Sequence, residues 1–116
     1  MLQVENLTRQ TMLISQGRVA DNFWTKFRGL MGVRQLPEGD GLLITHCDNV
    51  HTHFMRIPID VFYIDAQHQI VDIDPAMKTW RIGRKRTAAT SVIEAPSGTA
   101  NRTQSQVGDH LKILTG

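Results

Sequence analysis

The chain has 116 residues, of which 41% are hydrophobic and 21% charged, and its formal net charge is +2 at pH 7. We expect one domain over residues 1–116, because this length suits a single buried core. The small charge does not by itself indicate a polyanionic partner, and no stretch approaches the ~20 apolar residues of a membrane span. One cysteine cannot form an internal disulfide, and the start shows no signal peptide, so we expect a cytoplasmic protein.

Seven short runs of apolar and β-branched residues predict strands separated by turn residues. Gly17-Arg18 is interpreted as a turn after the second run, and Asp74-Pro75 as the end of the fifth. A short polar segment joins the fourth and fifth runs, which predicts a hairpin. In chain order the expected strands span residues 2–5, 11–15, 42–45, 57–64, 70–73, 88–95 and 110–114.

Two segments predict helices. Residues 21–31 carry apolar side chains at helical spacing behind Asp21 or Asn22, either of which is a good N-cap. Residues 100–105 suit a shorter helical turn, capped by Ser97 or Thr99. The pattern therefore predicts a mostly β (α+β) fold, in which a strongly curved or barrel-like, mainly antiparallel sheet accompanies one or two short helices.

The most apolar and most β-branched part of the chain is residues 51–65. Because side chains alternate along a strand, Asp60 should share one face with Phe62, while Val61 and Tyr63 share the other. An unpaired buried carboxylate is costly, so Asp60 must accept hydrogen bonds, pair with a cation or be protonated. One interpretation is structural, with loop N–H groups bonded to Asp60. The other is functional, with Asp60 in a cleft.

Five short motifs occur in an order that resembles a known family. They are Arg28-Gly29-Leu30-Met31, Asp40-Gly41-Leu42-Leu43-Ile44, the run from Phe54 to Asp65, Glu94-Ala95-Pro96-Ser97-Gly98, and Gly108-Asp109. Together they resemble the small bacterial and archaeal family catalogued as domain of unknown function 192, over about residues 7–114. The resemblance implies a compact, mostly β, barrel-like domain to which no activity is generally assigned, in a family whose members are often secreted. The chain departs from the family pattern at Phe54-Met55, where a tryptophan usually separates the two residues.

We expect a binding cleft near the central run, lined by Arg28, His53, Met55, Asp60 and Glu94. Arg28 and Asp60 carry opposite charges beside apolar neighbours, so we predict one polar cluster that holds both and can include Glu94. The favoured function is non-catalytic binding of a small ligand or a protein partner. The alternative is a hydrolase-like enzyme that uses Asp60 as acid or base, with or without a histidine-bound metal.

A metal site is the less favoured interpretation of Cys47, His51 and His53. Imidazole and thiolate suit zinc, but the chain has no CxxC and no HExxH motif, so no cofactor is predicted. Cys47 is also a weak candidate nucleophile, because a catalytic cysteine needs a histidine in contact and sequence neighbours on a strand point apart.

Residues 78–86 form a basic segment that contains an aromatic residue and no acid. Such a segment can contact phosphates and stack on a base. The plainer interpretation, favoured by the small net charge, is a solvated loop near the acidic hairpin before it. The residues concerned are Lys78, Trp80, Arg81, Arg84, Lys85 and Arg86.

Overall fold

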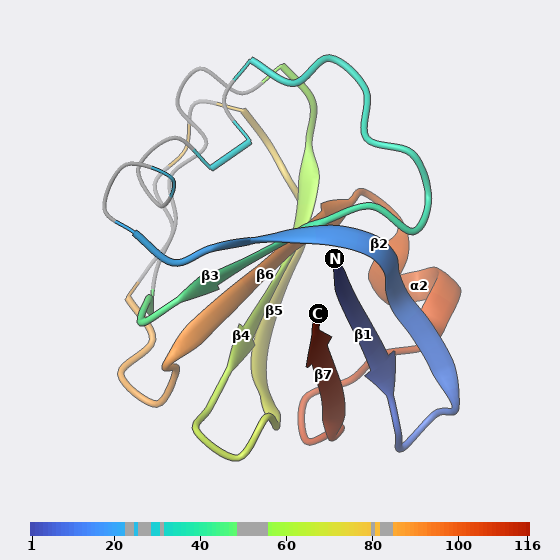
Figure 1. The fold of residues 1–116 in the computed structure, drawn as a ribbon, viewed down its shortest axis with the longest axis vertical. Coiled ribbons are helices and arrows are strands. Elements are labelled where there is room, and N and C mark those ends of the chain that lie inside the picture. The colour runs from blue at the N-terminus through green and yellow to red at the C-terminus, as the bar shows by residue number, and fades with distance from the viewer. Residues whose placement is uncertain (23–24, 26–28, 31, 49–55, 80, 82–84) are drawn as a thin grey trace.

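A computed structural model of the protein describes residues 1–22, 25, 29–30, 32–48, 56–79, 81 and 85–116. Seven strands in this part form one sheet with the order β5-β4-β6-β3-β2-β1-β7, which curls strongly (Figure 1). Neighbouring strands are antiparallel except β2 and β3. The predicted mostly β fold is confirmed. The elements are β1 (Leu2–Asn6), β2 (Thr11–Ala20), β3 (Leu42–Thr45), β4 (Ile59–Ile64), β5 (Ile70–Met77), β6 (Ser91–Pro96), α2 (Thr99–Thr103) and β7 (Leu111–Thr115).

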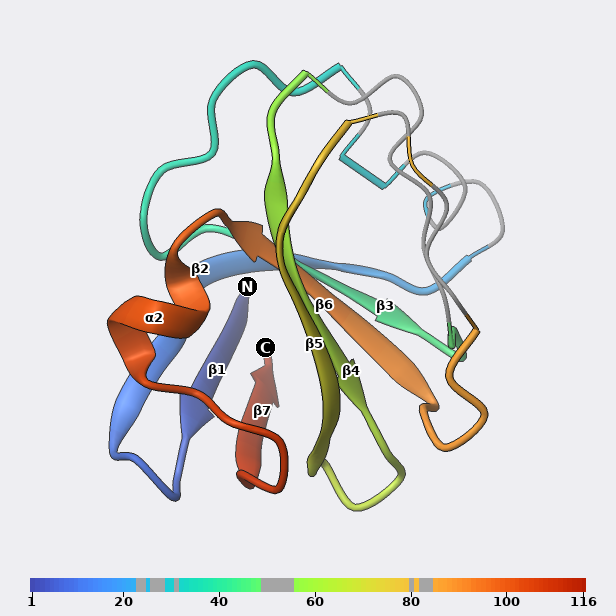
Figure 2. The same cartoon turned by 180° about the vertical axis from the view of Figure 1, so that it is seen from behind.

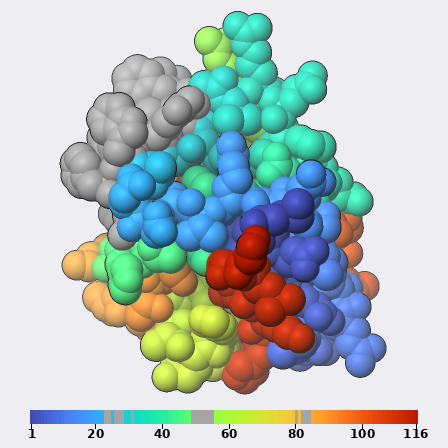
Figure 3. All heavy atoms as spheres, in the orientation of Figure 1, coloured from blue at the N-terminus to red at the C-terminus, as the bar shows by residue number. Residues whose placement is uncertain are grey.

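The two outermost strands of the sheet, β5 and β7, begin beside each other at the lower end of the view in Figure 1, where Gln69 and His110 form a bridge. At the meeting point the Ile70 N–H donates to the Asp109 carbonyl at 2.9 Å, and the Leu111 N–H donates to the His68 carbonyl at 2.8 Å. The two chain termini lie together beside β2 on the face of the molecule that Figure 3 shows. The sheet is therefore a half-barrel that closes only at one end.

Apolar side chains fill both faces of the curled sheet. On the inside, all seven strands contribute to one cluster, the inner core. On the outside, β2, β3, β4 and β6 carry a second cluster, the outer core. The inner core holds Leu2, Val4, Leu13, Ile14, Leu43, Phe62, Ile64, Ile70, Ile93, Ala95 and Leu111. The outer core holds Ala20, Leu30, Leu42, Ile44, Ile59, Val61, Tyr63, Ala89 and Val92.

Strand β4 is buried at every position because it contributes to both cores. Phe62 and Ile64 belong to the inner core, whereas Val61 and Tyr63 belong to the outer core. The prediction of a central strand buried on both faces is confirmed. The predicted hairpin of β4 with β5 is confirmed as well.

Strand β2 runs without a break from Thr11 to Ala20, so the predicted turn at Gly17-Arg18 is wrong. Gly17 is needed there for close packing. A Cβ on it would lie 2.7 Å from Ile14 Cγ2 and 2.8 Å from the carbonyl oxygen of Gly41. The glycine lets the backbone around Gly41 approach β2, which does not reverse at this point.

Strand β5 continues through Asp74-Pro75 to Met77, so the predicted end of the strand at the proline is also wrong. In the sheet β5 is an edge strand. A proline is tolerated at an edge because one side of the strand needs no ladder hydrogen bonds.

The expected helix over residues 21–31 lies largely outside the described residues. At its start, Asn22 Oδ1 accepts the Thr25 N–H at 2.9 Å, the hydrogen bond that an N-cap residue makes. The expected helical turn near residue 100 is α2, which lies beside β2 (Figure 2). Its N-cap is Gly98, and no side chain of the cap bonds the helix, so the predicted serine or threonine cap is wrong. No helix in the described ranges has the length and apolar character to cross a membrane.

Candidate functional site

Asp60 is buried at the start of β4, and both of its carboxylate oxygens are occupied. Oδ1 accepts the Ala76 N–H at 2.7 Å, and Oδ2 accepts the Ala100 N–H at 2.8 Å. Ala76 has a φ of 48°, within a segment where the pairing of β4 with β5 shifts register. Ala100 lies in the first turn of α2, where a carboxylate is favourable. Asp60 therefore ties β5 and α2 to the central strand, as its structural interpretation predicts.

Asp60 and Glu94 lie on opposite faces of the sheet. In the pairing of β4 with β6, Asp60 is opposite Ala95, whereas Glu94 is opposite Val61. Residues opposite one another share a face, and neighbours along a strand do not. Glu94 therefore does not share a polar cluster with Asp60, so its inclusion in the predicted cluster is wrong. The predicted pairing of Arg28 with Asp60 stays a prediction, because Arg28 lies outside the described residues.

Glu94 is the unusual group of the outer core. Its side chain is 2% exposed, and within the described part of the chain Oε1 has no hydrogen-bond partner. Both cross-strand neighbours, Leu42 and Val61, are apolar. Burial raises the pKa of Glu94 to about 7, because the ionised form loses its hydration. A buried carboxyl oxygen without a hydrogen-bond partner among the described residues is an exception in native proteins.

A row of paired residues crosses the outer face at Glu94. Arg18 on β2 pairs with Leu42 on β3, and Leu42 pairs with Glu94 on β6. Two strand spacings of about 4.8 Å each therefore separate the Arg18 and Glu94 backbones. Along this row the cationic Arg18 on β2, the apolar Leu42 on β3 and the buried acid Glu94 on β6 follow one another.

Arg18 lines two hollows on the surface. One, of about 210 Å³, has Val19, Ala20, Val33 and Leu42 among its apolar walls. The other, of about 480 Å³, lies between β2 and residues 37–40, which include two acids. The Arg18 backbone N–H donates to the Gly41 carbonyl at 3.1 Å. Its exposed guanidinium has no ion-pair partner among the described residues.

Arg86 is bound in an acidic cluster formed by Asp72 and Asp74 of β5, beside Tyr63 of β4. Its guanidinium lies 2.9 Å from Asp72 Oδ2 and 2.8 Å from Asp74 Oδ1, and it stacks 4.0 Å from the centroid of the Tyr63 ring. The Tyr63 hydroxyl donates to Asp74 Oδ2 at 2.8 Å. Burial and this hydrogen bond raise the pKa of Tyr63 above its ordinary value.

Arg86 is consequently not available for a phosphate, which corrects its inclusion among candidate nucleic-acid ligands. Its position confirms that this end of the basic segment lies against the acidic hairpin. Lys78, Arg81 and Lys85 are exposed, and the Lys85 Nζ is 3.7 Å from Asp48 Oδ2. Trp80 and Arg84 lie outside the described residues.

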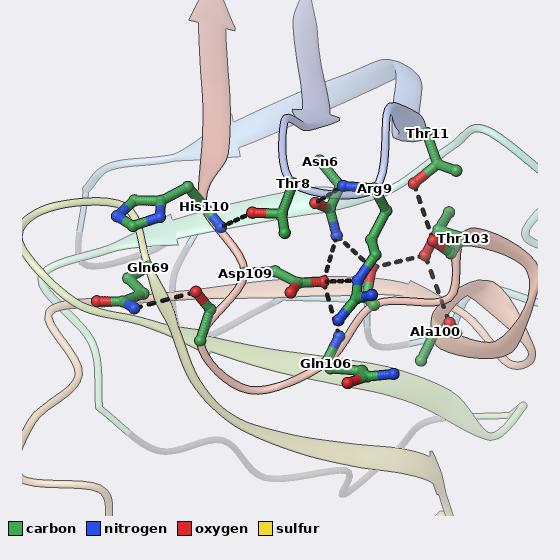
Figure 4. A network of polar contacts seen from close by, with 12 residues as sticks. Asn6, Thr8, Arg9, Thr11, Gln69, Ala100, Thr103, Gln106, Asp109 and His110 are labelled. Atoms are coloured by element: carbon green, nitrogen blue, oxygen red, sulfur yellow. Dashed lines mark hydrogen bonds and ion pairs between the residues drawn. The ribbon is translucent and has the colours of Figure 1, made fainter.

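A polar network ties the first hairpin to the turn before β7 (Figure 4). Asp109 Oδ2 accepts hydrogen bonds from Asn6 Nδ2 at 2.9 Å, from Arg9 Nε at 3.0 Å and from the Gln106 N–H at 3.0 Å. Burial alone would raise the pKa of Asp109, but these bonds and the charge of Arg9 outweigh it and lower the pKa. Because this buried carboxylate is paired, we interpret the network as structural.

The other expected site residues are only partly described. His51, His53 and Met55 lie outside the described residues. Cys47 packs against the outer core, and its N–H donates to the Thr90 carbonyl at 2.9 Å. Within the described ranges no three His, Cys, Asp or Glu side chains gather where they could hold a metal ion.

Of the row on the outer face, the sequence pointed to Glu94 but not to Arg18 or Leu42. Because a turn is predicted at Gly17-Arg18, Arg18 is not assigned to a strand and is not considered as a site residue. The residues from Thr11 to Ala20 do not alternate regularly between apolar and polar, so the local sequence carries no signal for Arg18.

Comparison with known proteins gives related sequences and folds. A UPF0127 protein of Pyrococcus furiosus is 30% identical over 112 residues, which cover 92% of this chain and 94% of that protein. A UPF0127 protein of Thermococcus kodakarensis is 32% identical over 96 residues, and the match spans 79% of this chain but only 60% of that relative.

Two crystal structures share the fold. One, of a protein of unknown function from Novosphingobium aromaticivorans, has a TM-score of 0.82 at 15% identity, covering 96% of this chain and 82% of that one. The other is a protein of Sinorhizobium meliloti, named as a candidate transcription regulator, with a TM-score of 0.81 at 19% identity and coverage of 96% and 90%. The profile of the family DUF192, described as uncharacterized ACR, matches residues 5–113, and the chain belongs to this family.

Proposed function

We propose that the protein is a non-catalytic binding domain, and that a small ligand occupies the outer face of the sheet over Arg18, Leu42 and Glu94. The observation that carries this proposal is Glu94, a buried carboxyl whose Oε1 has no partner among the described residues. Native proteins pair nearly all of their buried polar groups, so such an exception calls for an explanation. A ligand that supplies the missing hydrogen bond is the explanation we favour.

The surroundings of Glu94 support binding of an amphipathic molecule. Leu42 and Val61 flank it, and Leu42 also lines the hollow of about 210 Å³ together with the apolar residues Val19, Ala20 and Val33. Ligand sites typically combine apolar walls with a few convergent polar groups. A ligand with an apolar body and a hydrogen-bonding head group fits this description.

The two competing functions lose their main support. An enzyme that uses Asp60 as acid or base would need a carboxylate oxygen free to take up a proton, but both oxygens of Asp60 accept backbone hydrogen bonds. Nucleic-acid binding through residues 78–86 loses Arg86 to the acidic cluster.

We place the protein in the cytoplasm because a chain with one cysteine cannot use an internal disulfide.

The test is a titration followed by amide NMR spectra, with hexylamine and hexanamide as probes at millimolar concentration. Both molecules have a short apolar body and a head group that can donate to a carboxylate. We expect saturable shifts in the amide signals of Leu42, Val92 and Glu94. Glu94→Leu should abolish these shifts, and Glu94→Gln provides a second variant if the leucine protein does not fold. As a control, Glu5→Gln on β1 should bind like the wild type.

Shifts that map elsewhere, or that persist in the Glu94 variants, would refute the proposed site. The absence of any saturable shift with either probe would refute ligand binding on this face.

A further inference from the structure

The smaller of the two hollows beside Arg18, of about 210 Å³, lies where β2 and β3 begin to pair. The two strands line one side of it, and the segment that joins them lines the other. The strands contribute Arg18, Ala20 and Leu42, and the joining segment contributes Thr25, Gly29 and Val33. A cavity of about 150 Å³ can hold benzene, so a hollow of this size has room for an apolar chain of about six carbons.

The chemistry of the lining is simple. Among the described residues that line this hollow, Arg18 is the charged one. Its guanidinium is exposed and has no ion-pair partner within the described ranges. The Thr25 hydroxyl is already engaged, because it donates to the Asn22 carbonyl at 3.2 Å. The hollow therefore presents an unpaired cation next to apolar surface.

From this arrangement we infer that the hollow binds a short monocarboxylate, with its carboxylate on Arg18 and its apolar chain against Val33 and Leu42. Arginine suits the acid group, since its planar fork donates two parallel hydrogen bonds to a carboxylate. The chain is stabilised because it leaves water for apolar surface. The inference goes beyond the proposed function, because it needs Arg18 and the hollow but no contact with Glu94.

The surroundings of Arg18 favour a ligand with one acid group. A second acid group inside the hollow would lose its hydration against apolar walls, which is costly. On the other side of Arg18, the larger hollow includes Asp40 and Glu38, and these acids would repel it. An amine in place of the acid group would be repelled by Arg18 itself. The hollow should therefore select for a single negative charge at one end of an apolar chain.

The experiment is an amide NMR titration with hexanoate at pH 7, read at Ala20, Val33 and Leu42. Methyl hexanoate is the reference, because it has the same chain without the charge. We expect hexanoate to bind about tenfold more tightly than the ester, as one charge-assisted hydrogen bond provides. Butanoate should bind more weakly than hexanoate, and octanoate should gain nothing further, because the hollow has room for about six carbons.

Substitutions at Arg18 test the role of its guanidinium. Arg18→Gln should reduce hexanoate affinity about tenfold, to that of the ester, and leave binding of the ester unchanged. Arg18→Lys keeps the charge but not the planar fork, so its affinity should lie between those of the wild type and Arg18→Gln. Arg34→Gln removes an exposed arginine that does not line the hollow, and this matched control should bind like the wild type.

The outcomes separate this inference from the proposed function. The inference is refuted if hexanoate causes no saturable shift at Ala20 and Val33, if it binds no better than the ester, or if Arg18→Gln leaves its affinity unchanged. None of these results affects hexylamine binding at Glu94, which tests the proposed function. Glu94→Leu should leave hexanoate binding intact, and a loss of binding in that variant would place the acid outside the hollow and refute the inference.

Discussion

Replacing Glu94 by glutamine should change how the stability of the protein responds to pH. Burial raises the pKa of Glu94 from 4.5 to about 7 in the folded protein, whereas the unfolded chain ionises near the ordinary value. Between these two values the folded state binds a proton that the unfolded state has lost. The unfolding free energy of the wild type therefore decreases as pH rises from about 4.5 to about 7 and stays low above that.

The size of the effect follows from the two pKa values. At 1.36 kcal/mol for each pH unit, the ionised carboxyl costs about 3 kcal/mol of stability above pH 7. Most of this cost appears between pH 5 and pH 8, where the wild type should lose roughly 2–3 kcal/mol from this group. For a domain of this size, the same loss lowers the melting temperature by about 10 °C. Glu94→Gln keeps the shape of the side chain but has no proton to exchange, so it should escape the loss.

The assay is urea unfolding of the wild type and of Glu94→Gln at pH 5 and at pH 8. The unfolding free energy of Glu94→Gln minus that of the wild type should be roughly 2–3 kcal/mol larger at pH 8 than at pH 5. Other titrating groups contribute equally to both proteins and cancel in this difference. Glu5→Gln on β1 is taken through the same measurement as the control variant. An equal difference at both pH values would mean that Glu94 ionises normally, and the reasoning about its burial would be refuted.

Three further changes test the structural residues. Asp60→Ala should cost about 3 kcal/mol, because two backbone N–H groups lose their acceptor. Hydrogen exchange at Ala76 and Ala100 should accelerate, and unchanged protection there would contradict the assigned role. Gly41→Ala should cost about 1–3 kcal/mol in urea unfolding, since the new Cβ would lie 2.9 Å from the Glu94 carbonyl oxygen, while the same change at the C-terminal glycine should cost nothing. The lowered pKa of Asp109 stabilises the fold above the ordinary carboxyl pKa, so the deficit of Asp109→Asn in urea unfolding should shrink as pH falls below about 4, and a constant deficit would argue against it.

The positions of most strands could be predicted because each strand is a short run of apolar and β-branched residues bounded by turn residues. The central strand is the clearest case, since Phe62 and Val61 lie in the two cores that alternation assigns them. The prediction failed at Gly17, where glycine is a common turn residue. In the structure its missing side chain makes room for Gly41, which lies far along the chain. Local sequence does not show such a contact, because it depends on which strands become neighbours.

The candidate site could be predicted only in part, for a similar reason. The sequence indicated that Asp60 and Glu94 were acids among apolar residues, but not which faces they share. The relative faces depend on the register between β4 and β6, and a shift by one residue would place the two acids on the same side. Arg18 could be placed beside Leu42 only from the structure, in which β2 continues past Gly17 and pairs with β3.

Asp60 and Glu94 are both buried, but they differ in the hydrogen bonds that their carboxylate oxygens accept. Asp60 is as buried as Glu94, but it receives N–H groups from Ala76 and Ala100, which are 16 and 40 residues away along the chain. The fold compensates the cost of burying Asp60, so its presence needs no ligand to explain it. Glu94 Oε1 receives no such bond from the described residues and lies between Leu42 and Val61. The described residues leave the burial of Glu94 uncompensated, and this difference from Asp60 is the observation on which the proposed site depends.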